Sequence, residues 1–396
     1  MGKLAINGGS PVRSSYLPYG HQSISEADIS SVVSALKSDY ITQGPLIEKF
    51  EKLFADYIGR KYAVAVSSGT AALHAATFAS GLKKGEIGIT SPISFVASSN
   101  CIIYQNGRPS FVDINSEIQM DSFALENTID KKTKLIIPVN FAGQCCDIDS
   151  IISIASSNNS IVIEDCCHAL GSEFKGIKAG KKSDMAIFSF HPVKHMTTGE
   201  GGMVVTDNID YYKKLLSFRT HGIIRDEQLY DDISGAWYYE MQTLGFNYRM
   251  TDFQAALGIS QLKRLDEFIE RRREIATLYN SQLSNIDEID LIPSHSDSKS
   301  AFHIFPIMLN MKNLRVNRKI IYDSLIAENI GVNVHYIPIH LQPYYRSTFG
   351  YKAGDYPLAE DYYSRCLTIP IFPSMSDKDV YSVIEAIKKV TEFYKS

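Results

Sequence analysis

Residues Phe188–Gly202 read FSFHPVKHMTTGEGG, and this stretch decides the fold prediction. An apolar run, Met185 to Phe190, precedes Lys194, and a polar, glycine-rich turn then leads into a second apolar run, Met203 to Thr206. A lysine in this place would lie at the mouth of a sheet. Partial desolvation there lowers the pKa of its amine, which can then act as a nucleophile or form a Schiff base. Most lysines after strands are ordinary surface residues, so the functional interpretation depends on residues elsewhere in the chain.

Length and composition predict a two-domain protein that handles small molecules. The chain has 396 residues, of which 44% are hydrophobic, and this is too long for one ordinary domain. We expect a large domain over residues 1–255, including the N-terminal segment. A long connecting helix and a small C-terminal domain would occupy residues 256–396. The net charge of −4 predicts neither nucleic acid nor an anionic membrane as a partner.

The N-terminus MGKLAINGGS has no apolar run behind its lysine, and no apolar stretch approaches membrane-spanning length, so we expect a cytoplasmic protein. The six cysteines include the adjacent pairs Cys145/Cys146 and Cys166/Cys167 and lack CxxC spacing. This pattern favours reduced, buried thiols over a zinc site, and no metal is predicted.

Short β-rich runs alternate with helical segments through the first half of the chain. Helical spacing covers Ile24–Leu36 and Pro45–Ile58. The expected strands are Tyr62–Val66, Glu86–Thr90, Ser110–Asp113, Lys134–Val139, Ser160–Glu164, Met185–Phe190 and Met203–Thr206. This alternation predicts an α/β fold with a seven-stranded, mostly parallel sheet whose ligands bind at the carboxyl ends of the strands.

The second half of the chain predicts a smaller α/β lobe. One long helical pattern starts near Thr251 and continues to Leu283. After it we expect a strand, a helix, a strand and a helix, over Ala301–Leu309, Arg318–Glu328, Gly331–Tyr336 and Asp377–Tyr394. The tyrosine-rich segment from His335 to Tyr363 is expected to be an irregular loop.

Chemically useful residues follow several of these strands. The run SSGTAALHAA, Ser67 to Ala76, opens a helix with small residues whose free N–H groups would suit a phosphate, although an ordinary capped helix would look the same. Phe95 follows the second strand and could stack on a flat ring, although an aromatic residue there is more often part of the core.

Further polar residues end the fifth and sixth strands. A carboxylate such as Asp165, at the end of an apolar strand, is costly to bury unless it meets a positive group, so it is a candidate partner for a protonated ring nitrogen. His168 could reach the same ligand, and Ser189 and Lys194 end the sixth strand. A phosphate site, a stacking aromatic, a carboxylate and a lysine make up the set that pyridoxal phosphate requires. No GxGxxG motif supports a dinucleotide instead.

The chain resembles the DegT/DnrJ/EryC1/StrS family of sugar aminotransferases, fold type I pyridoxal-phosphate enzymes, over essentially its whole length. The matching stretches are AINGGSPVR, SDYITQGP, SSGTAAL, TSPISFVASSN, EDCCHALGS, FSFHPVKHMTTGEGG, GFNYRMTDFQAALG and VHYIPIH. Within the family, the chain looks most like the branch that aminates a UDP-linked 4-keto-6-deoxy-N-acetylhexosamine on the route to pseudaminic acid, a cell-surface polysaccharide component.

The resemblance implies a role for each matching residue. Lys194 would carry the cofactor in a Schiff base, and Asp165 would hold the pyridine nitrogen protonated. His168 would face the ring hydroxyl, where many relatives have glutamine. The phosphate would be bound by Gly69, Thr70 and Ser189, and the ring covered by Phe95. Asn247 would reach the phosphate of the neighbouring subunit in a homodimer with shared active sites, and His335 and Tyr336 would lie near the sugar nucleotide.

The resemblance also implies the reaction and its alternatives. L-glutamate would give its amino group to the cofactor, with Lys194 as general base, and the cofactor would pass it to the C4 ketone of the UDP-linked sugar. Other nucleotide-linked keto-sugars, aminated at C3 or C4, remain possible. A related dehydratase branch carries histidine where this chain has Lys194, which argues against dehydration. A silent relative that binds the cofactor and regulates is a third hypothesis.

Overall fold

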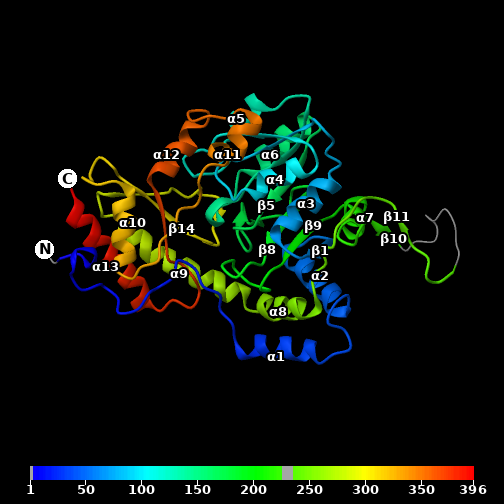
Figure 1. Ribbon diagram of the computed structural model, residues 1–396, viewed down its shortest axis with the longest axis horizontal. Helices are drawn as coiled ribbons and strands as arrows, with labels where there is room; N and C mark the ends of the chain where they lie inside the picture. The colour runs from blue at the N-terminus through cyan, green and yellow to red at the C-terminus, as the bar shows by residue number, and fades with distance from the viewer. Residues whose placement is uncertain (1–2, 225–234) are drawn as a thin grey trace.

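The computed structural model describes residues 3–224 and 235–396 (Figure 1). A seven-stranded sheet forms its centre, with strand order β1-β9-β8-β5-β4-β2-β3. The strands are β1 (Tyr62–Val66), β2 (Ile87–Thr90), β3 (Arg108–Phe111), β4 (Thr133–Ile137), β5 (Ile161–Asp165), β8 (Met185–Ser189) and β9 (Gly202–Thr206). Within this sheet β9 is antiparallel to both of its neighbours, and the other strand pairs are parallel. The predicted α/β fold with a mostly parallel sheet is confirmed.

Alternating side chains bury both faces of this sheet. On one face, Ala65 and Phe188 pack in a core with helices α2 (Pro45–Ile58), α5 (Ser122–Thr128), α6 (Ile148–Ser157) and α8 (Asp252–Leu262). On the other face, Val64 and Ile187 pack with α3 (Gly69–Ala79), α4 (Ala97–Tyr104) and α7 (Ile209–Phe218). Because successive residues of a strand point to opposite faces, a sheet covered on both sides has strands that are apolar throughout.

The N-terminal helix α1 (Glu26–Leu36) lies along α8 at the bottom of Figure 1. A capping box at its start, in which Ser25 and Asp28 bond each other's backbone N–H groups, sets its first turn. Helix α2 follows after Gly44 with Pro45 at its first position, where the missing N–H costs nothing. Both predicted helices are present.

The long helical pattern from Thr251 forms two helices, α8 and α9 (Leu265–Leu283), and the expectation of one continuous helix is wrong. The chain leaves helical geometry at Arg264, with φ −106° and ψ 2°. Ala255 of α8 packs into the core of the large sheet, whereas Ile275 and Tyr279 of α9 pack into the core of the C-terminal elements. Leu265 and Ile269, at the start of α9, still pack into the first core, so the change of core occurs within α9 and not at the break.

The C-terminal lobe contains an antiparallel sheet of β12 (Ile289–Leu291), β14 (Phe305–Leu309) and β15 (Cys366–Ile369), in the order β12-β14-β15. Helices α10 (Arg318–Ala327) and α13 (Asp377–Tyr394) form as expected. The strand expected over Gly331–Tyr336 is absent, because only Asn333 pairs with a neighbouring strand, in a single bridge to Thr368.

The segment from His335 to Tyr363 is not the irregular loop that we expected. It contains the short turn η4 (Ile339–Leu341) and the helices α11 (Pro343–Phe349) and α12 (Pro357–Arg365). A proline stands at the first position of each of these two helices, where its fixed φ favours helix initiation.

Short elements complete the structure. They are η1 (Ala5–Asn7), η2 (Phe141–Gly143), the hairpin β10 (Ile223–Ile224) and β11 (Glu240–Met241), and a small sheet of β13 (Ser298–Lys299), β6 (Glu173–Phe174) and β7 (Ile177–Lys178). Leu4 and Leu17 pack into the core of the C-terminal lobe. The division at residue 255 stays a prediction. Among residues 3–224 and 235–396, no helix is long and apolar enough to cross a membrane.

Candidate active site

A cavity of about 570 Å³ opens at the carboxyl ends of β5 and β8 and at the start of α3. The segment from Asn333 to Tyr336, which belongs to the C-terminal lobe, closes one wall. All but one of the predicted site residues line this cavity, namely Gly69, Thr70, Phe95, Asp165, His168, Ser189, Lys194, His335 and Tyr336. Residues spread over much of the chain therefore meet in one place.

Lys194 lies on the turn between β8 and β9. Its backbone N–H bonds the carbonyl of His191 (2.9 Å), and the N–H of Phe190 bonds the carbonyl of Gly201 (2.9 Å), which closes the turn behind it. Burial lowers the pKa of the Lys194 amine, and the nearby Cys167 and Asp165 oppose this effect only in part. A lysine with a lowered pKa has more of its amine free at neutral pH, which a nucleophile or a base requires.

Asp165 ends β5 and is 4% exposed. Its Oδ2 accepts a hydrogen bond from the Ser98 hydroxyl (2.7 Å), and its Oδ1 accepts one from the backbone N–H of Cys167 (3.1 Å). These neutral donors orient the carboxylate toward the cavity without cancelling its charge. A protonated ring nitrogen placed there would meet the buried carboxylate that it needs.

The start of α3 forms the anion-binding end of the cavity. The Ser68 hydroxyl caps the helix by accepting a hydrogen bond from the N–H of Ala71. The N–H groups of Gly69 and Thr70, in the first turn, have no carbonyl partner within the helix and are available to an anion. A Cβ on Gly69 would lie 2.8 Å from the Cβ of Ser189, so only glycine lets the helix approach this serine so closely. This close approach brings two hydroxyls, from Thr70 and Ser189, to one end of the cavity.

His168 and Tyr336 form a pair across the cavity. The Tyr336 hydroxyl lies 3.1 Å from His168 Nε2, whereas His168 Nδ1 is buried and has no hydrogen-bond partner. Burial, with the charge of Lys194, lowers the pKa of His168 well below its ordinary value, so the ring is neutral. Phe95 is 59% exposed, and its ring centre lies 6.3 Å from that of Tyr336.

His335 is hydrogen-bonded to the antiparallel sheet β12-β14-β15 of the C-terminal lobe. Its Nδ1 lies 2.8 Å from the hydroxyl of Thr368 on β15. Burial lowers the pKa of His335 to about 4.

Asn247 does not join the cavity of its own chain. It is exposed on a strand-like segment that pairs with Thr220, and the adjacent Phe246 carbonyl accepts a bond from the N–H of His221 (3.0 Å). Its predicted contact with the cofactor of a neighbouring subunit stays a prediction.

The sequence analysis gave no role to several further residues of the site. Tyr19, Ser98, Glu200 and His303 also line the cavity. Glu200 lies inside the quoted stretch FSFHPVKHMTTGEGG and Ser98 inside the quoted stretch TSPISFVASSN, so both were within reach of motif analysis. Tyr19 and His303 come from segments distant in sequence, with no local signal.

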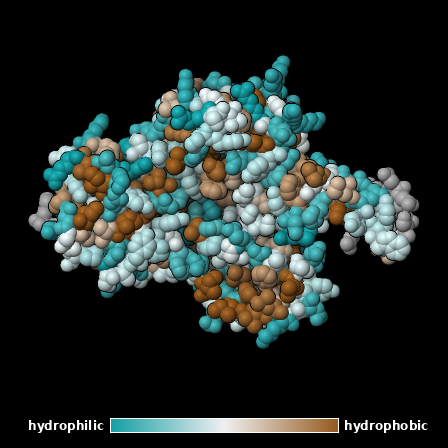
Figure 2. Space-filling view, in the orientation of Figure 1, coloured by the Kyte–Doolittle hydropathy of each residue, from teal (hydrophilic) through white to brown (hydrophobic). Residues whose placement is uncertain are grey.

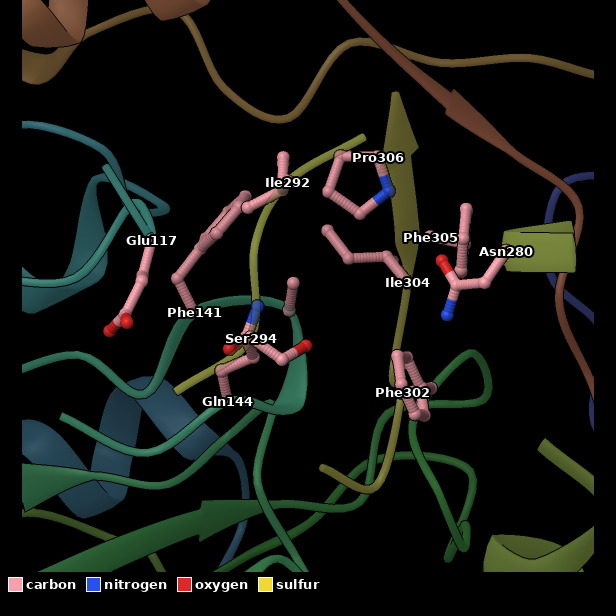
Figure 3. A pocket seen from close by; sticks show the side chains of 11 residues that line it. Glu117, Phe141, Gln144, Asn280, Ile292, Ser294, Phe302, Ile304, Phe305 and Pro306 are labelled. Carbon is pink, nitrogen blue, oxygen red and sulfur yellow. The ribbon is translucent and has the colours of Figure 1, made fainter. Parts of the chain in front are cut away.

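A second cavity lies behind Phe141, whose ring also contacts Tyr336 and His168 in the first (Figure 3). Figure 3 shows the turn that carries Phe141 and Gln144 facing the segment of β14. The second cavity has a volume of about 30 Å³, which leaves room for about one water molecule, and its walls are mostly apolar. It is too small for a substrate.

In the described part of the chain, no group of three or more His, Cys, Asp or Glu side chains could hold a metal ion.

Related proteins match this chain over nearly its whole length. The uncharacterized protein MJ1066 of Methanocaldococcus jannaschii is 44% identical, over 96% of this chain and 98% of its own length. A Campylobacter jejuni UDP-4-amino-4,6-dideoxy-N-acetyl-beta-L-altrosamine transaminase is 35% identical, over 94% and 99%. The GDP-perosamine synthase of Escherichia coli O157:H7 is also 35% identical, over 96% and 99%.

Solved structures agree with these relatives. Helicobacter pylori PseC, an aminotransferase of pseudaminic acid biosynthesis, has a TM-score of 0.89 at 29% identity, covering 96% of this chain and 100% of its own. A sugar aminotransferase of Streptococcus pneumoniae in its pyridoxal-phosphate form has a TM-score of 0.88 at 30% identity, covering 96% and 99%. The family model of the DegT/DnrJ/EryC1/StrS aminotransferases matches residues 22–388. The chain therefore belongs to this family, and it is a pyridoxal-phosphate-dependent sugar aminotransferase.

Proposed function

We propose that this protein transfers the amino group of L-glutamate to the C4 ketone of a UDP-linked 4-keto-6-deoxy-N-acetylhexosamine. The product would be UDP-4-amino-4,6-dideoxy-N-acetyl-beta-L-altrosamine, a precursor of pseudaminic acid. The amination chemistry is supported by one observation: the Lys194 amine and the Asp165 carboxylate line the same cavity. The names of the Campylobacter relative and of PseC support the choice of sugar.

A second candidate is an aminotransferase for another nucleotide-linked keto-sugar. The GDP-perosamine synthase relative matches this chain at the same identity, 35%, as the altrosamine transaminase. Overall identity therefore gives neither sugar an advantage, and only a direct assay separates them.

The cavity residues fit pyridoxal phosphate. A helix start that requires glycine at Gly69 suits the phosphate, and the unpartnered, buried Nδ1 of His168 suits a polar group on the ring. We assign Thr70 and Ser189 to the phosphate, Asp165 to the ring nitrogen and Phe95 to the ring face. When bound, the cofactor supplies the carbonyl that receives the amino group and the electron sink that stabilises the adjacent carbanion.

Lys194 would then act twice. Its amine would hold the cofactor at rest and would be released when L-glutamate takes its place. The free amine would remove the proton from the α-carbon of the donor and return it to the cofactor side, as a general base and then an acid. Its lowered pKa favours the uncharged form that can accept this proton. Tyr336 and Phe95 would limit the access of water above the reacting atoms.

A homodimer would complete the site. Helix α1 exposes Ile29, Val33 and Leu36, and Figure 2 shows hydrophobic side chains gathered over this part of the molecule. The hairpin of β10 and β11 projects from the body in Figure 1, and Trp237 beside it is 76% exposed. Such apolar surface is typical of an interface between subunits. In this arrangement Asn247 would reach the phosphate of the partner's cofactor. The cytoplasmic location stays a prediction.

The test is the visible spectrum of the purified protein with pyridoxal phosphate, before and after L-glutamate, followed by a panel of keto-sugars. We expect a visible band that glutamate bleaches and that the UDP-linked 4-keto-sugar restores, with the amino sugar as product. Restoration by the GDP-linked 4-keto-sugar alone would favour the second candidate. A band that glutamate leaves unchanged would contradict the proposed donor and favour a silent, cofactor-binding regulator.

A further inference from the structure

Four buried histidines surround Lys194, and the sequence analysis gave a role to only two of them. His168 and His335 were expected near the cofactor and the sugar. His195 and His303 were not, although both are buried. The ring of His303 lies between the other two, with centre distances of 4.3 Å to His168 and 5.5 Å to His195.

His303 touches the reacting amine. Its Nε2 lies 3.3 Å from Lys194 Nζ, the only hydrogen-bond contact of that amine among the described residues. The ring is 4% exposed, and its Nδ1 has no partner. His303 is therefore placed to act on Lys194 through one nitrogen.

The backbone that carries His303 is held from three sides. The guanidinium of Arg272, on α9, donates through Nη1 to the carbonyls of Phe302 (3.1 Å), His303 (3.0 Å) and Ile371 (2.9 Å). The N–H of Ala301 bonds the hydroxyl of Ser172 (3.1 Å), and the carbonyl of Ala301 faces His195 Nε2 at 3.2 Å. Four of these five contacts hold the segment Ala301–His303 directly, and they fix the position of the imidazole.

The surroundings keep this imidazole uncharged. The groups that face it are Lys194 on its own turn, His195 beside it, His168 after β5 and Arg272 on α9. Burial lowers the pKa of His303 well below its ordinary value, and the positive charges of Lys194 and Arg272 act in the same direction. Arg272 is 0% exposed and has no carboxylate partner among the described ion pairs, so its charge is not neutralised locally. A neutral imidazole can accept a hydrogen bond through an unprotonated Nε2.

We infer that His303 is a positioning residue for Lys194, whose amine donates a hydrogen bond to His303 Nε2 whenever it is detached from the cofactor. This inference rests on the proposed role of Lys194. When the amine takes up the proton from the donor carbon, it becomes an ammonium. The ammonium donates a stronger hydrogen bond to His303 Nε2 and transfers no proton to it. His303 gains and loses no proton in the cycle. It holds the amine at the cavity wall between its two tasks.

The test compares two substitutions. His303→Met removes the nitrogen acceptor and puts an apolar side chain of similar length in its place. His303→Gln puts an amide oxygen, which is also an acceptor, near the position of Nε2. The full-length protein is freed of cofactor and mixed with pyridoxal phosphate across a range of pH. The rate at which the visible band appears is then measured. This rate rises as the Lys194 amine loses its proton. The midpoint of the curve of rate against pH therefore gives the pKa of that amine.

We expect the midpoint to fall by about 1 to 2 pH units in His303→Met, because losing one hydrogen bond to a charged group disfavours the ammonium by that amount. In His303→Gln the midpoint should stay near that of the wild type. His195→Gln is the matched control, because His195 is equally buried and bonds Ala301 instead of Lys194; it should not move the midpoint. The single-turnover rate at saturating glutamate should fall in His303→Met while the glutamate concentration for half-maximal rate stays the same.

An unchanged midpoint in His303→Met would overturn the inference, as would an equal fall in His303→Gln. A rise would overturn it too, since it would mean that His303 is a cation that repels the ammonium. If the methionine variant does not fold, the nitrogen NMR signals of histidine-labelled wild type, assigned with His303→Gln, decide: a protonated Nε2 on His303 contradicts the inference. If wild type forms no visible band at all, the proposed role of Lys194 fails first.

Discussion

Acidification from about pH 7 to about pH 5 should destabilise this fold strongly through its buried histidines. Burial lowers the pKa of His74 and His335 to about 4. The pKa values of His168, His195 and His303 are lowered well below 6.5. In each case the unfolded chain binds a proton at a higher pH than the folded chain does. Stability is therefore complete above about pH 6.5 and is lost as the pH falls toward about 4.

The size of the effect follows from these values. A histidine with a pKa of 6.5 unfolded and about 4 or lower when folded loses about 1.8 kcal/mol between about pH 7 and pH 5. His74 and His335 would together lose about 3.6 kcal/mol, which is a large part of the whole stability of a typical protein, about 5–15 kcal/mol, and the three other buried histidines act in the same direction. Carboxylates with lowered pKa values, such as Asp28 and Asp379, lose stability only below their ordinary value of 3.8, outside this window.

Urea unfolding at several pH values measures this directly. The protein is freed of cofactor and kept at one concentration, because ligand binding and association would add their own pH dependence. His74→Gln should reduce the loss by about 1.8 kcal/mol, the share of one histidine whose pKa is lowered to about 4. A free energy of unfolding that is equal at the two pH values, or higher in acid, would refute the reasoning.

The remaining predictions concern single residues of the site and the interface. Lys194→Ala should abolish transamination while the circular dichroism spectrum stays that of the wild type; turnover measured as 2-oxoglutarate release would contradict the assignment. Asp165→Asn should slow the glutamate half-reaction by about 100-fold or more, because a neutral amide cannot balance a protonated ring, and stopped-flow absorbance would detect an unchanged rate. Gly69→Ala should weaken cofactor binding by roughly 10- to 150-fold through crowding of Ser189, as an equilibrium titration would measure. Leu36→Asp should convert the proposed dimer to monomers in sedimentation, and it should change the free energy of unfolding of the monomer by no more than about 0.5 kcal/mol.

The strands were predictable because local pattern decides them. Each central strand begins within two residues of its expected start, since a buried parallel strand is apolar throughout and ends at a polar or glycine-rich turn. Asp165, Ser189 and Lys194 were found by the same logic, because Asp165 and Ser189 end two strands of one sheet and Lys194 lies on the turn after the second of them.

The errors have long-range causes. The break at Arg264 has no proline or glycine beside it, so the local sequence does not show it. The expected strand at Gly331–Tyr336 has the right residues, but only Asn333 finds a partner. His303 was missed because its contact with Lys194 spans 109 residues of sequence. By contrast, Pro343 and Pro357 were visible signs of helix starts in a segment that we expected to be irregular.

The start and the end of the described chain are joined in the C-terminal lobe. Leu4 and Leu17 share one core with Val383 and Val390, and Arg13 forms an ion pair with Asp379 (2.6 Å). During synthesis on a ribosome, the first residues must therefore wait for the last helix before their apolar side chains are covered. The wall at His335 and Tyr336 belongs to the same lobe. A prematurely terminated polypeptide without α13 would leave the apolar side chains of Leu4 and Leu17 uncovered and would leave the lobe that carries the wall of the cavity without part of its core.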